Sequence, residues 1–325
     1  MIDLSKNELN MPIPEVVLER VTLNIADSLY KYPTSTLEKV IDLAEESLAF
    51  SGESALLTRG VDEAIDLVIE AFSGHHFITL TPEFEGFWQR MIIKNQKFDK
   101  IPFNENFSWP SDKLENVSNK SLLYLSSPNN PTGIDFPLSH VNMVVKKGCI
   151  VFLDRTYRDF SKEPEKFEQQ ASSLIRFYSF SKAYALAGQR LGVLVGSAKI
   201  IEKLRAKQLY CHIDTFSLAI LVEVFRNGWG RRYGQKTIKL RNKFVSRLQG
   251  IGINAINTET NFILINSSAS FELAKFLETK GYLVRLTDSL GLPEYIRIAV
   301  GDDSVQWGVI RSLKEWQKIR GNSFI

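Results

Sequence analysis

Two kinds of hydrophobic pattern alternate along the first 230 residues of the chain. Short, mostly apolar runs occur at residues 76–80, 99–103, 121–125, 149–154, 174–178 and 191–195. Segments with apolar residues three and four positions apart occur at residues 36–50, 61–72, 199–210 and 217–225. The first kind predicts strands buried on both faces, and the second predicts amphipathic helices. Together they predict an α/β fold with a mainly parallel sheet flanked by helices.

The pattern changes after a long basic helix predicted at residues 231–249, whose cationic side is most simply a solvated face. Strand, helix, strand, strand and helix are then predicted at residues 261–265, 271–280, 282–286, 295–300 and 304–319. Residues 1–14 are polar, contain Pro12 and Pro14, and are predicted to form an extended arm. We therefore expect a large domain of residues 30–230 and a small α/β domain made of residues 1–29 and 231–325.

The composition is that of an ordinary globular protein. The 325 residues are 44% hydrophobic and 24% charged with a net charge of +3, and no basic cluster is interleaved with aromatic residues, which argues against nucleic-acid binding. Neither a membrane-spanning stretch nor a signal-peptide pattern is found. Cys149 and Cys211 form neither a CxxC motif nor a disulfide framework, and the histidines lack the spacing of metal ligands. We expect a soluble cytoplasmic protein without a metal site.

Candidate functional side chains follow the predicted strands at their carboxyl ends. Asp154 ends one strand, Asn130 lies in the turn SPNNPTG after another, and Lys182 follows a third. The carboxyl edge of a parallel sheet is where α/β proteins bind ligands. Lys182 also has small hydroxyl groups beside it and a guanidinium, that of Arg190, eight residues later. This segment therefore predicts an anion-binding site next to an amine.

A second anion site is predicted where Gly60 precedes a helix. The backbone N–H groups in the first turn, at Val61 and Asp62, have no partner within the helix, and the helix dipole favours negative charge there. Asp62 could equally cap this helix, since a capping carboxylate uses one donor and leaves others for a phosphate.

Taken in order, these motifs resemble the fold-type I aminotransferases that use pyridoxal 5′-phosphate (PLP), and most of all the histidinol-phosphate aminotransferases. The resemblance implies a large domain with a seven-stranded, mainly parallel sheet, a smaller α/β domain, and a homodimer with sites at its interface. It implies that Lys182 forms an imine with the PLP aldehyde and moves protons, that Asp154 pairs with the pyridine nitrogen, and that Tyr157 and Asn130 hydrogen-bond the 3′-oxygen. Phe84 would stack on the ring, although core packing is an equal alternative for it.

The resemblance also assigns residues to the cofactor phosphate and to the substrate. The phosphate group is implied to be held by Gly60, Val61, Asp62, Ser179, Ser181 and Arg190, with Tyr32 reaching in from the partner subunit. Arg297 is implied to grip the substrate carboxylate, and Asn7 lies in an arm that crosses the substrate. Arg285 matches an arginine associated with phosphate-bearing substrates, but an internal salt bridge is equally open to it.

Histidinol phosphate with the glutamate/2-oxoglutarate pair is the first substrate that the resemblance implies. Leu9, Phe84, Arg155 and Thr156 depart from the family pattern, so another phosphorylated amine or an aromatic amino acid stays open. Two other functions also stay open: a PLP-dependent decarboxylase of a phosphorylated amino acid, similar to threonine-phosphate decarboxylases, and a non-catalytic PLP-binding module.

Overall fold

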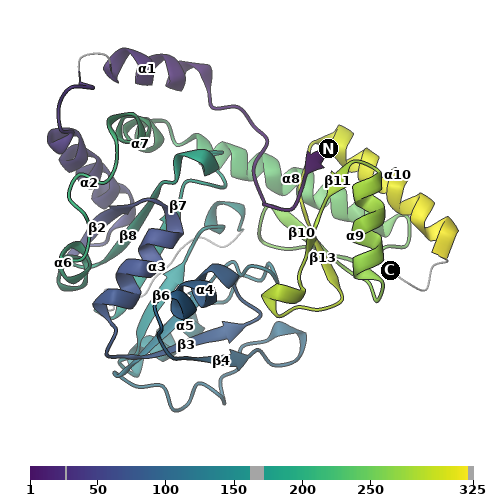
Figure 1. Ribbon diagram of the computed structural model, residues 1–325, viewed down its shortest axis with the longest axis horizontal. Helices are drawn as coiled ribbons and strands as arrows, with labels where there is room; N and C mark the ends of the chain where they lie inside the picture. Colours follow the sequence, from purple (N-terminus) through teal and green to yellow (C-terminus); the bar gives the residue numbers. More distant parts are fainter. Residues whose placement is uncertain (26–27, 162–171, 321–325) are drawn as a thin grey trace.

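The computed structural model describes residues 1–25, 28–161 and 172–320 as two α/β lobes (Figure 1). The larger lobe contains most of the first 230 residues, and the smaller contains the C-terminal part of the chain. Two segments run between them: helix α8 (Trp229–Gln249) and the N-terminal arm, which ends in the small lobe as strand β1 (Ile2–Asp3). The arm thereby crosses from one lobe to the other.

The large lobe is built on a seven-stranded sheet in the order β2-β8-β7-β6-β5-β3-β4. Strand β8 is antiparallel to both neighbours, and the other neighbouring pairs are parallel. The seven-stranded, mainly parallel sheet that the resemblance implied is thus confirmed. Its strands are β2 (Glu53–Thr58), β3 (His76–Thr81), β4 (Phe98–Pro102), β5 (Ser121–Ser126), β6 (Ile150–Asp154), β7 (Leu174–Ser179) and β8 (Gly192–Ser197).

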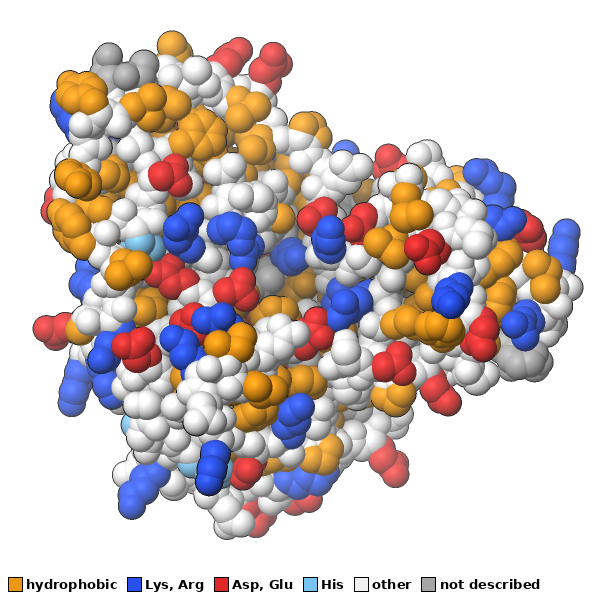
Figure 2. All heavy atoms as spheres, viewed as in Figure 1, with side chains coloured by type: hydrophobic (Ala, Val, Ile, Leu, Met, Phe, Trp, Pro, Cys, Tyr) orange, Lys and Arg blue, Asp and Glu red, His pale blue; other side chains and the backbone are white. Residues whose placement is uncertain are grey.

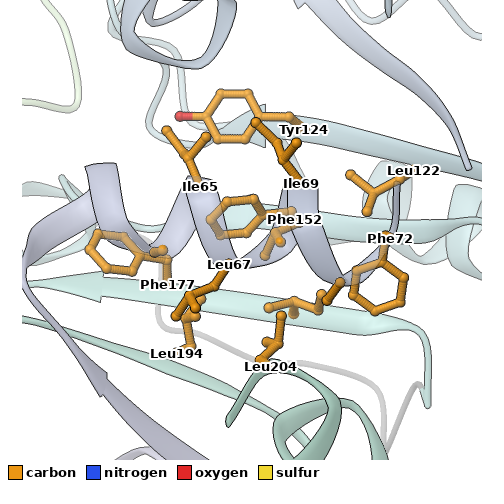
Figure 3. Packing of buried hydrophobic residues seen from close by; sticks show 14 of the residues in the cluster. Ile65, Leu67, Ile69, Phe72, Leu122, Tyr124, Phe152, Phe177, Leu194 and Leu204 are labelled. Atoms are coloured by element: carbon orange, nitrogen blue, oxygen red, sulfur yellow. The ribbon is translucent and has the colours of Figure 1, made fainter. Parts of the chain in front are cut away.

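Helices cover both faces of this sheet. They are α2 (Thr34–Leu48), α3 (Gly60–Ala71), α4 (Glu85–Ile93), α5 (Leu138–Lys146), α6 (Ala198–Arg205) and α7 (Thr215–Asn227). Figure 3 shows how α3 is held: Ile65 and Ile69 lie against side chains of the central strands, among them Phe152. Each such side chain contributes about 1.5–3 kcal/mol when it is fully buried. This packing fixes the start of α3, and with it the position of Gly60 at the carboxyl edge of the sheet.

The small lobe contains a four-stranded antiparallel sheet in the order β12-β13-β10-β9 and a two-stranded parallel sheet of β1 and β11. Its remaining elements are β9 (Ala255–Ile256), β10 (Phe262–Asn266), α9 (Ser270–Thr279), β11 (Tyr282–Leu283), β12 (Arg285–Leu286), β13 (Tyr295–Ala299) and α10 (Asp303–Arg320). Arg285 on β12 is directly opposite Arg297 on β13. The register therefore brings two cations together on one ladder.

Some elements differ from those expected. The strand predicted at residues 282–286 is two short strands in different sheets, and the helix predicted at residues 199–210 ends at Arg205. Strand β2 and helix α5 were not predicted. Helix α1 (Glu15–Ile25) follows the arm, and its Val17 and Val21 are buried with residues of α2 and α7. The large lobe thus includes α1, whereas the sequence pattern placed residues 1–29 in the small domain.

Candidate active site

A pocket of about 510 Å³ is lined by residues of the large lobe, the small lobe and the N-terminal arm. Charged side chains of both signs gather along the hollow between the lobes (Figure 2). Most of the predicted site residues line this one pocket: Asn7, Val61, Asp62, Phe84, Asn130, Asp154, Tyr157, Ser179, Ser181, Lys182, Arg190, Arg285 and Arg297. Gly60 lies just behind the lining, and Tyr32 is at the surface, where it is 80% exposed. The fold therefore brings together residues that are up to 290 positions apart, from Asn7 to Arg297.

Asp154 ends β6 and is almost completely buried. Its Oδ1 accepts hydrogen bonds from the Thr156 N–H (2.9 Å) and hydroxyl (2.6 Å), and its Oδ2 accepts one from the Tyr124 hydroxyl (3.1 Å). Burial raises the pKa of Asp154, and these hydrogen bonds oppose the rise. A cation placed against this carboxylate would therefore be held strongly, as a protonated ring nitrogen would be.

Lys182 follows β7, and its Nζ donates a hydrogen bond to the Lys6 carbonyl at 3.0 Å. Burial, reinforced by the positive charge of Arg297, lowers its pKa to about 8, while Glu8 acts in the opposite direction. At this pKa a useful fraction of the amine is neutral near pH 7–8. A neutral amine is the form that attacks an aldehyde, so the chemistry expected of Lys182 is available here.

Tyr157 and Asn130 lie on the same side of the pocket as the arm. The Tyr157 hydroxyl accepts a hydrogen bond from Asn7 Nδ2 at 2.9 Å, and burial raises the pKa of Tyr157. Asn7 has a left-handed backbone (φ 55°) and is held by Asn261, whose Nδ2 donates to its carbonyl at 2.9 Å. The phenol therefore stays protonated and keeps a proton to donate.

Arg297 is buried without a counter-ion among the described residues. Its Nη1 donates to Asn130 Oδ1 (2.5 Å) and its Nη2 to the Ser5 carbonyl (2.6 Å), while its Nε is buried without a hydrogen-bond partner. Burial lowers the pKa of Arg297, because desolvation penalises the charged form. An uncompensated buried guanidinium is unfavourable, so an anion entering the pocket would be bound here.

Arg285 makes an internal salt bridge, which was one of the two alternatives that the sequence allowed for it. Its Nη2 lies 2.6 Å from Glu85 Oε1, and Ser289 donates to Glu85 Oε2 at 3.0 Å and accepts from Arg285 at 3.1 Å. The bridge joins the first turn of α4 in the large lobe to the small lobe. A substrate anion can therefore use Arg285 only in competition with Glu85.

The predicted phosphate site consists of Gly60, Arg190 and their neighbours. Gly60 has a φ of 77°, which favours glycine, and a Cβ at that position would lie 2.8 Å from Arg190 Nη2 and displace the guanidinium. Arg190 pairs with Asp62 at 2.9 Å. The alternative that Asp62 caps its helix is wrong: the N-cap is Arg59, and Glu63 accepts the Arg59 N–H at 2.5 Å. Asp62 binds the guanidinium because the helix starts earlier than the capping pattern implied.

Phe84 precedes α4 and both lines the pocket and packs against the hydrophobic core of the large lobe. A Cβ at Gly86 would lie 2.4 Å from the Phe84 ring, so the glycine makes room for this orientation. The two alternatives considered for Phe84, cofactor stacking and core packing, are therefore compatible.

Sequence patterns missed several residues at the site. Tyr124 and Thr156 bind the Asp154 carboxylate, Glu85 pairs with Arg285, and Glu83 is completely buried beside Ser126. Arg155, a departure from the family pattern, faces neither solvent nor the pocket: it is buried and pairs with Asp135 at 2.8 Å. Periodicity carried no signal for these residues: Tyr124, Glu85 and Arg155 have partners that are distant in the sequence, and Thr156 bonds Asp154 through a local turn rather than through a repeating pattern.

The donor and acceptor set fits PLP. The pocket offers a lysine of lowered pKa, a buried carboxylate, and a glycine cradle beside an arginine and two serines, which match the aldehyde, the ring nitrogen and the phosphate. When it is bound, this cofactor supplies an electron sink for the pair left by a broken bond at the substrate Cα. Lys182 would hold it, Asp154 would face its ring nitrogen, and Arg190, Ser179 and Ser181 would face its phosphate.

Comparisons with known proteins agree with PLP as the cofactor. The family model described as aminotransferase class I and II matches residues 1–307. The histidinol-phosphate aminotransferase of Thermococcus kodakarensis is 26% identical over 322 residues, covering 98% of this chain and 93% of that protein. That of Acinetobacter baylyi is 26% identical over 330 residues, covering 97% and 90%.

Solved structures share the fold over nearly the full length. One from Burkholderia pseudomallei, described as an aminotransferase, has a TM-score of 0.89 at 27% identity and covers 97% of this chain and 98% of its own. The L-threonine-O-3-phosphate decarboxylase of Porphyromonas gingivalis has a TM-score of 0.83 at 20% identity, covering 98% and 100%. With the family model matching almost the whole chain and the pocket fitting the cofactor, this protein belongs to the class I and II aminotransferases, which are PLP-dependent enzymes.

Proposed function

We propose that this aminotransferase moves an amino group between glutamate and a small phosphorylated substrate, with histidinol phosphate as the first candidate. The observation that carries the proposal is the buried Arg297, which has no carboxylate partner among the described residues and has Arg285 opposite it on the neighbouring strand. Two cations at one end of the pocket suit a dianionic phosphate or a dicarboxylate. Relatives with about the same length carry the name histidinol-phosphate aminotransferase.

The residues of the chain would divide the work as follows. Arg297 binds the substrate anion and fixes the orientation of the reacting carbon. Lys182, with its pKa near 8, takes a proton from that carbon and returns it elsewhere as general base and acid. Asp154 keeps the ring nitrogen of the cofactor protonated, and the Tyr157 hydroxyl is a hydrogen-bond donor beside the reacting atoms.

The direct test is to incubate the PLP-loaded enzyme with histidinol phosphate and 2-oxoglutarate and to measure glutamate formation. We expect turnover, and we expect Lys182→Ala to abolish it. Release of CO2 from a phosphorylated amino acid, without consumption of an oxo acid, would instead support the decarboxylase alternative. Cofactor binding without turnover of any donor would support the non-catalytic alternative.

We also propose that the protein is a homodimer in the cytoplasm. Large apolar side chains are exposed on α1, on the segment before α2 and after α6, including Leu23, Leu29, Tyr30, Leu209 and Tyr210. Tyr210 is close enough to Tyr32 to interact with it electrostatically, so these exposed side chains adjoin the residue expected to reach the partner's phosphate site. Figure 2 shows orange side chains gathered over this end of the large lobe. None of the helices in the described part of the chain is both long and apolar enough to cross a membrane.

The dimer is tested by light scattering coupled to size-exclusion chromatography. We expect twice the monomer mass, and Tyr32→Ala should weaken PLP binding without changing that mass. A monomer with full activity would contradict the dimer.

A further inference from the structure

Glu83 is a completely buried carboxylic acid that the proposed chemistry does not use. It lies two residues after β3, next to the end of β5, its neighbour in the sheet. The residue after it is Phe84, and β5 leads through Ser126 to Asn130. Glu83 thus stands between the two loops that carry the predicted ring-stacking and 3′-oxygen contacts.

Its hydrogen bonds tie these loops together. Oε1 accepts the Phe84 N–H at 2.8 Å and the Ser126 hydroxyl, and Oε2 accepts the Ser126 N–H at 2.9 Å. The Ser126 Oγ in turn accepts from the Asn130 N–H (3.2 Å) and from Asn129 Nδ2 (3.2 Å). One side chain therefore connects the backbone of Phe84, through a single serine, to the backbone of Asn130.

A count of donors and acceptors shows what this arrangement requires. A hydroxyl group has one proton and two lone pairs, and Ser126 uses both lone pairs for Asn129 and Asn130. Its proton is then available only for Glu83, and the other two partners of Glu83 are N–H donors. The network is complete when both oxygens of Glu83 accept hydrogen bonds. An ionised carboxylate can do this, whereas an amide has only one oxygen.

Keeping a carboxylate there is unfavourable by itself. Burial raises the pKa of Glu83 to about 8, and the negative charge of Asp154 acts in the same direction. The three hydrogen bonds oppose the rise but do not cancel it, so Glu83 reaches the ionised form that completes the network as the pH rises through about 8. No cation lies within ion-pair distance of Glu83 among the described residues. A neutral side chain would avoid this penalty, so a role in stability alone does not account for an acid at this position.

We propose that Glu83 is a positioning residue, which holds the Phe84 ring and the Asn130 amide in fixed relation across the cofactor pocket. It acts through the loops and touches neither cofactor nor substrate. This role goes beyond the proposed transamination and does not depend on which substrate is used.

The test compares Glu83→Gln with the wild type in PLP-loaded protein, with affinity and circular dichroism measured at about pH 9, where Glu83 is ionised. The amide of glutamine turns one acceptor into a donor, which would face the N–H of either Phe84 or Ser126, so the hydrogen bond to that backbone is lost. We expect about tenfold weaker PLP binding, the effect of losing one hydrogen bond to a charged group. We also expect a smaller visible circular dichroism signal from the bound cofactor. The midpoint of the pH titration of its absorption band should move upward, because an Asn130 donor that faces the 3′-oxygen would stabilise the deprotonated form of that oxygen.

Two further variants separate positioning from folding. Glu223→Gln changes another buried glutamate, on α7, whose partners are Arg20, Arg226 and Asn227, and it should leave all three cofactor measurements unchanged. Ser126→Ala removes the link to Asn130 but keeps the Phe84 contact, so it should shift the titration midpoint and leave most of the dichroism. If Glu83→Gln does not fold, the proposal is tested by the titration midpoint of the cofactor band in Ser126→Ala.

Unchanged cofactor affinity, dichroism and titration in a folded Glu83→Gln protein would overturn the proposal, as would an unchanged midpoint in Ser126→Ala. Failure of the wild type to make glutamate would overturn the proposed substrate instead. The two failures are distinguishable because the cofactor measurements need no substrate.

Discussion

At the scale of single residues, the cations of the site differ in whether they have a carboxylate partner. Lys182 and Arg297 use backbone carbonyls of the arm as their hydrogen-bond acceptors, while Arg285 and Arg190 each have a carboxylate. A carbonyl satisfies a hydrogen bond without neutralising the charge. The first two cations are therefore the ones that gain most from an anionic ligand, and the positive charge of Arg297 helps to lower the pKa of Lys182.

The rate at which PLP attaches to the unloaded protein should follow the deprotonation of Lys182. The pKa of this amine is lowered from its usual value to about 8, so the rate should rise with pH and level off above about pH 8. Arg297→Met removes a positive charge that lowers this pKa. We therefore expect the midpoint of the pH–rate profile of this variant to lie at higher pH. Stopped-flow absorbance measures the rate of PLP attachment at each pH. Arg311→Met, at an exposed position of α10, is the control and should keep the wild-type midpoint.

Replacing Glu85 by glutamine should release Arg285 for the substrate. The pair is partly exposed, so its net strength is modest, about 0.2–1 kcal/mol. We expect the KM for a phosphorylated amine to fall by up to about fivefold with little change in kcat. Steady-state kinetics measures this, and an increased KM would show that Glu85 itself contacts the substrate.

At the scale of helices and strands, glycines decide how closely the elements can approach the pocket. Gly60→Ala would introduce a Cβ at a positive φ and against Arg190. We expect a loss of about 1 kcal/mol in the free energy of unfolding and weaker PLP binding. Urea denaturation and cofactor titration measure the two effects. Gly74→Ala is a matched control, since nothing lies within 4 Å of its Cβ position, and it should leave both quantities unchanged.

The same scale shows what a single sequence can predict. Strands that are apolar at almost every position, such as β5 and β6, were located to within one or two residues, because two buried faces leave no other pattern. Strand β2 begins with polar residues, and α1 exposes Val16, Leu18 and Leu23, so neither shows a clean period. The residues at strand ends were found because motifs mark them. Glu83 and Glu85 were not, since their partners Ser126 and Arg285 are brought in by the tertiary fold.

At the scale of the whole molecule, the buried acids couple stability to pH. In the folded protein the pKa of Glu83 is raised to about 8, whereas in the unfolded chain it is ordinary, near 4.5. Between these values the folded state holds a proton that the unfolded state has lost. The contribution of Glu83 to the free energy of unfolding is therefore largest below about pH 4.5, and this contribution declines as pH rises toward 8.

This contribution is on the order of 4 kcal/mol, and Asp154, whose pKa burial also raises, acts in the same sense. Urea denaturation of PLP-free protein from pH 5 to 8.5 should show the decline, and Glu83→Gln should flatten it. Binding of PLP should flatten it as well, because a cationic ring compensates Asp154. A slope in Glu83→Gln equal to that of the wild type would contradict this assignment.

The arm that crosses between the lobes places the carbonyls of Ser5 and Lys6 on Arg297 and Lys182, the two groups that cofactor and substrate need. The backbone of the arm thus occupies the same hydrogen-bond donors that a bound ligand would use. A cofactor or substrate group that binds Lys182 or Arg297 would replace these two hydrogen bonds, so the net affinity for each ligand is reduced by what the arm already contributes.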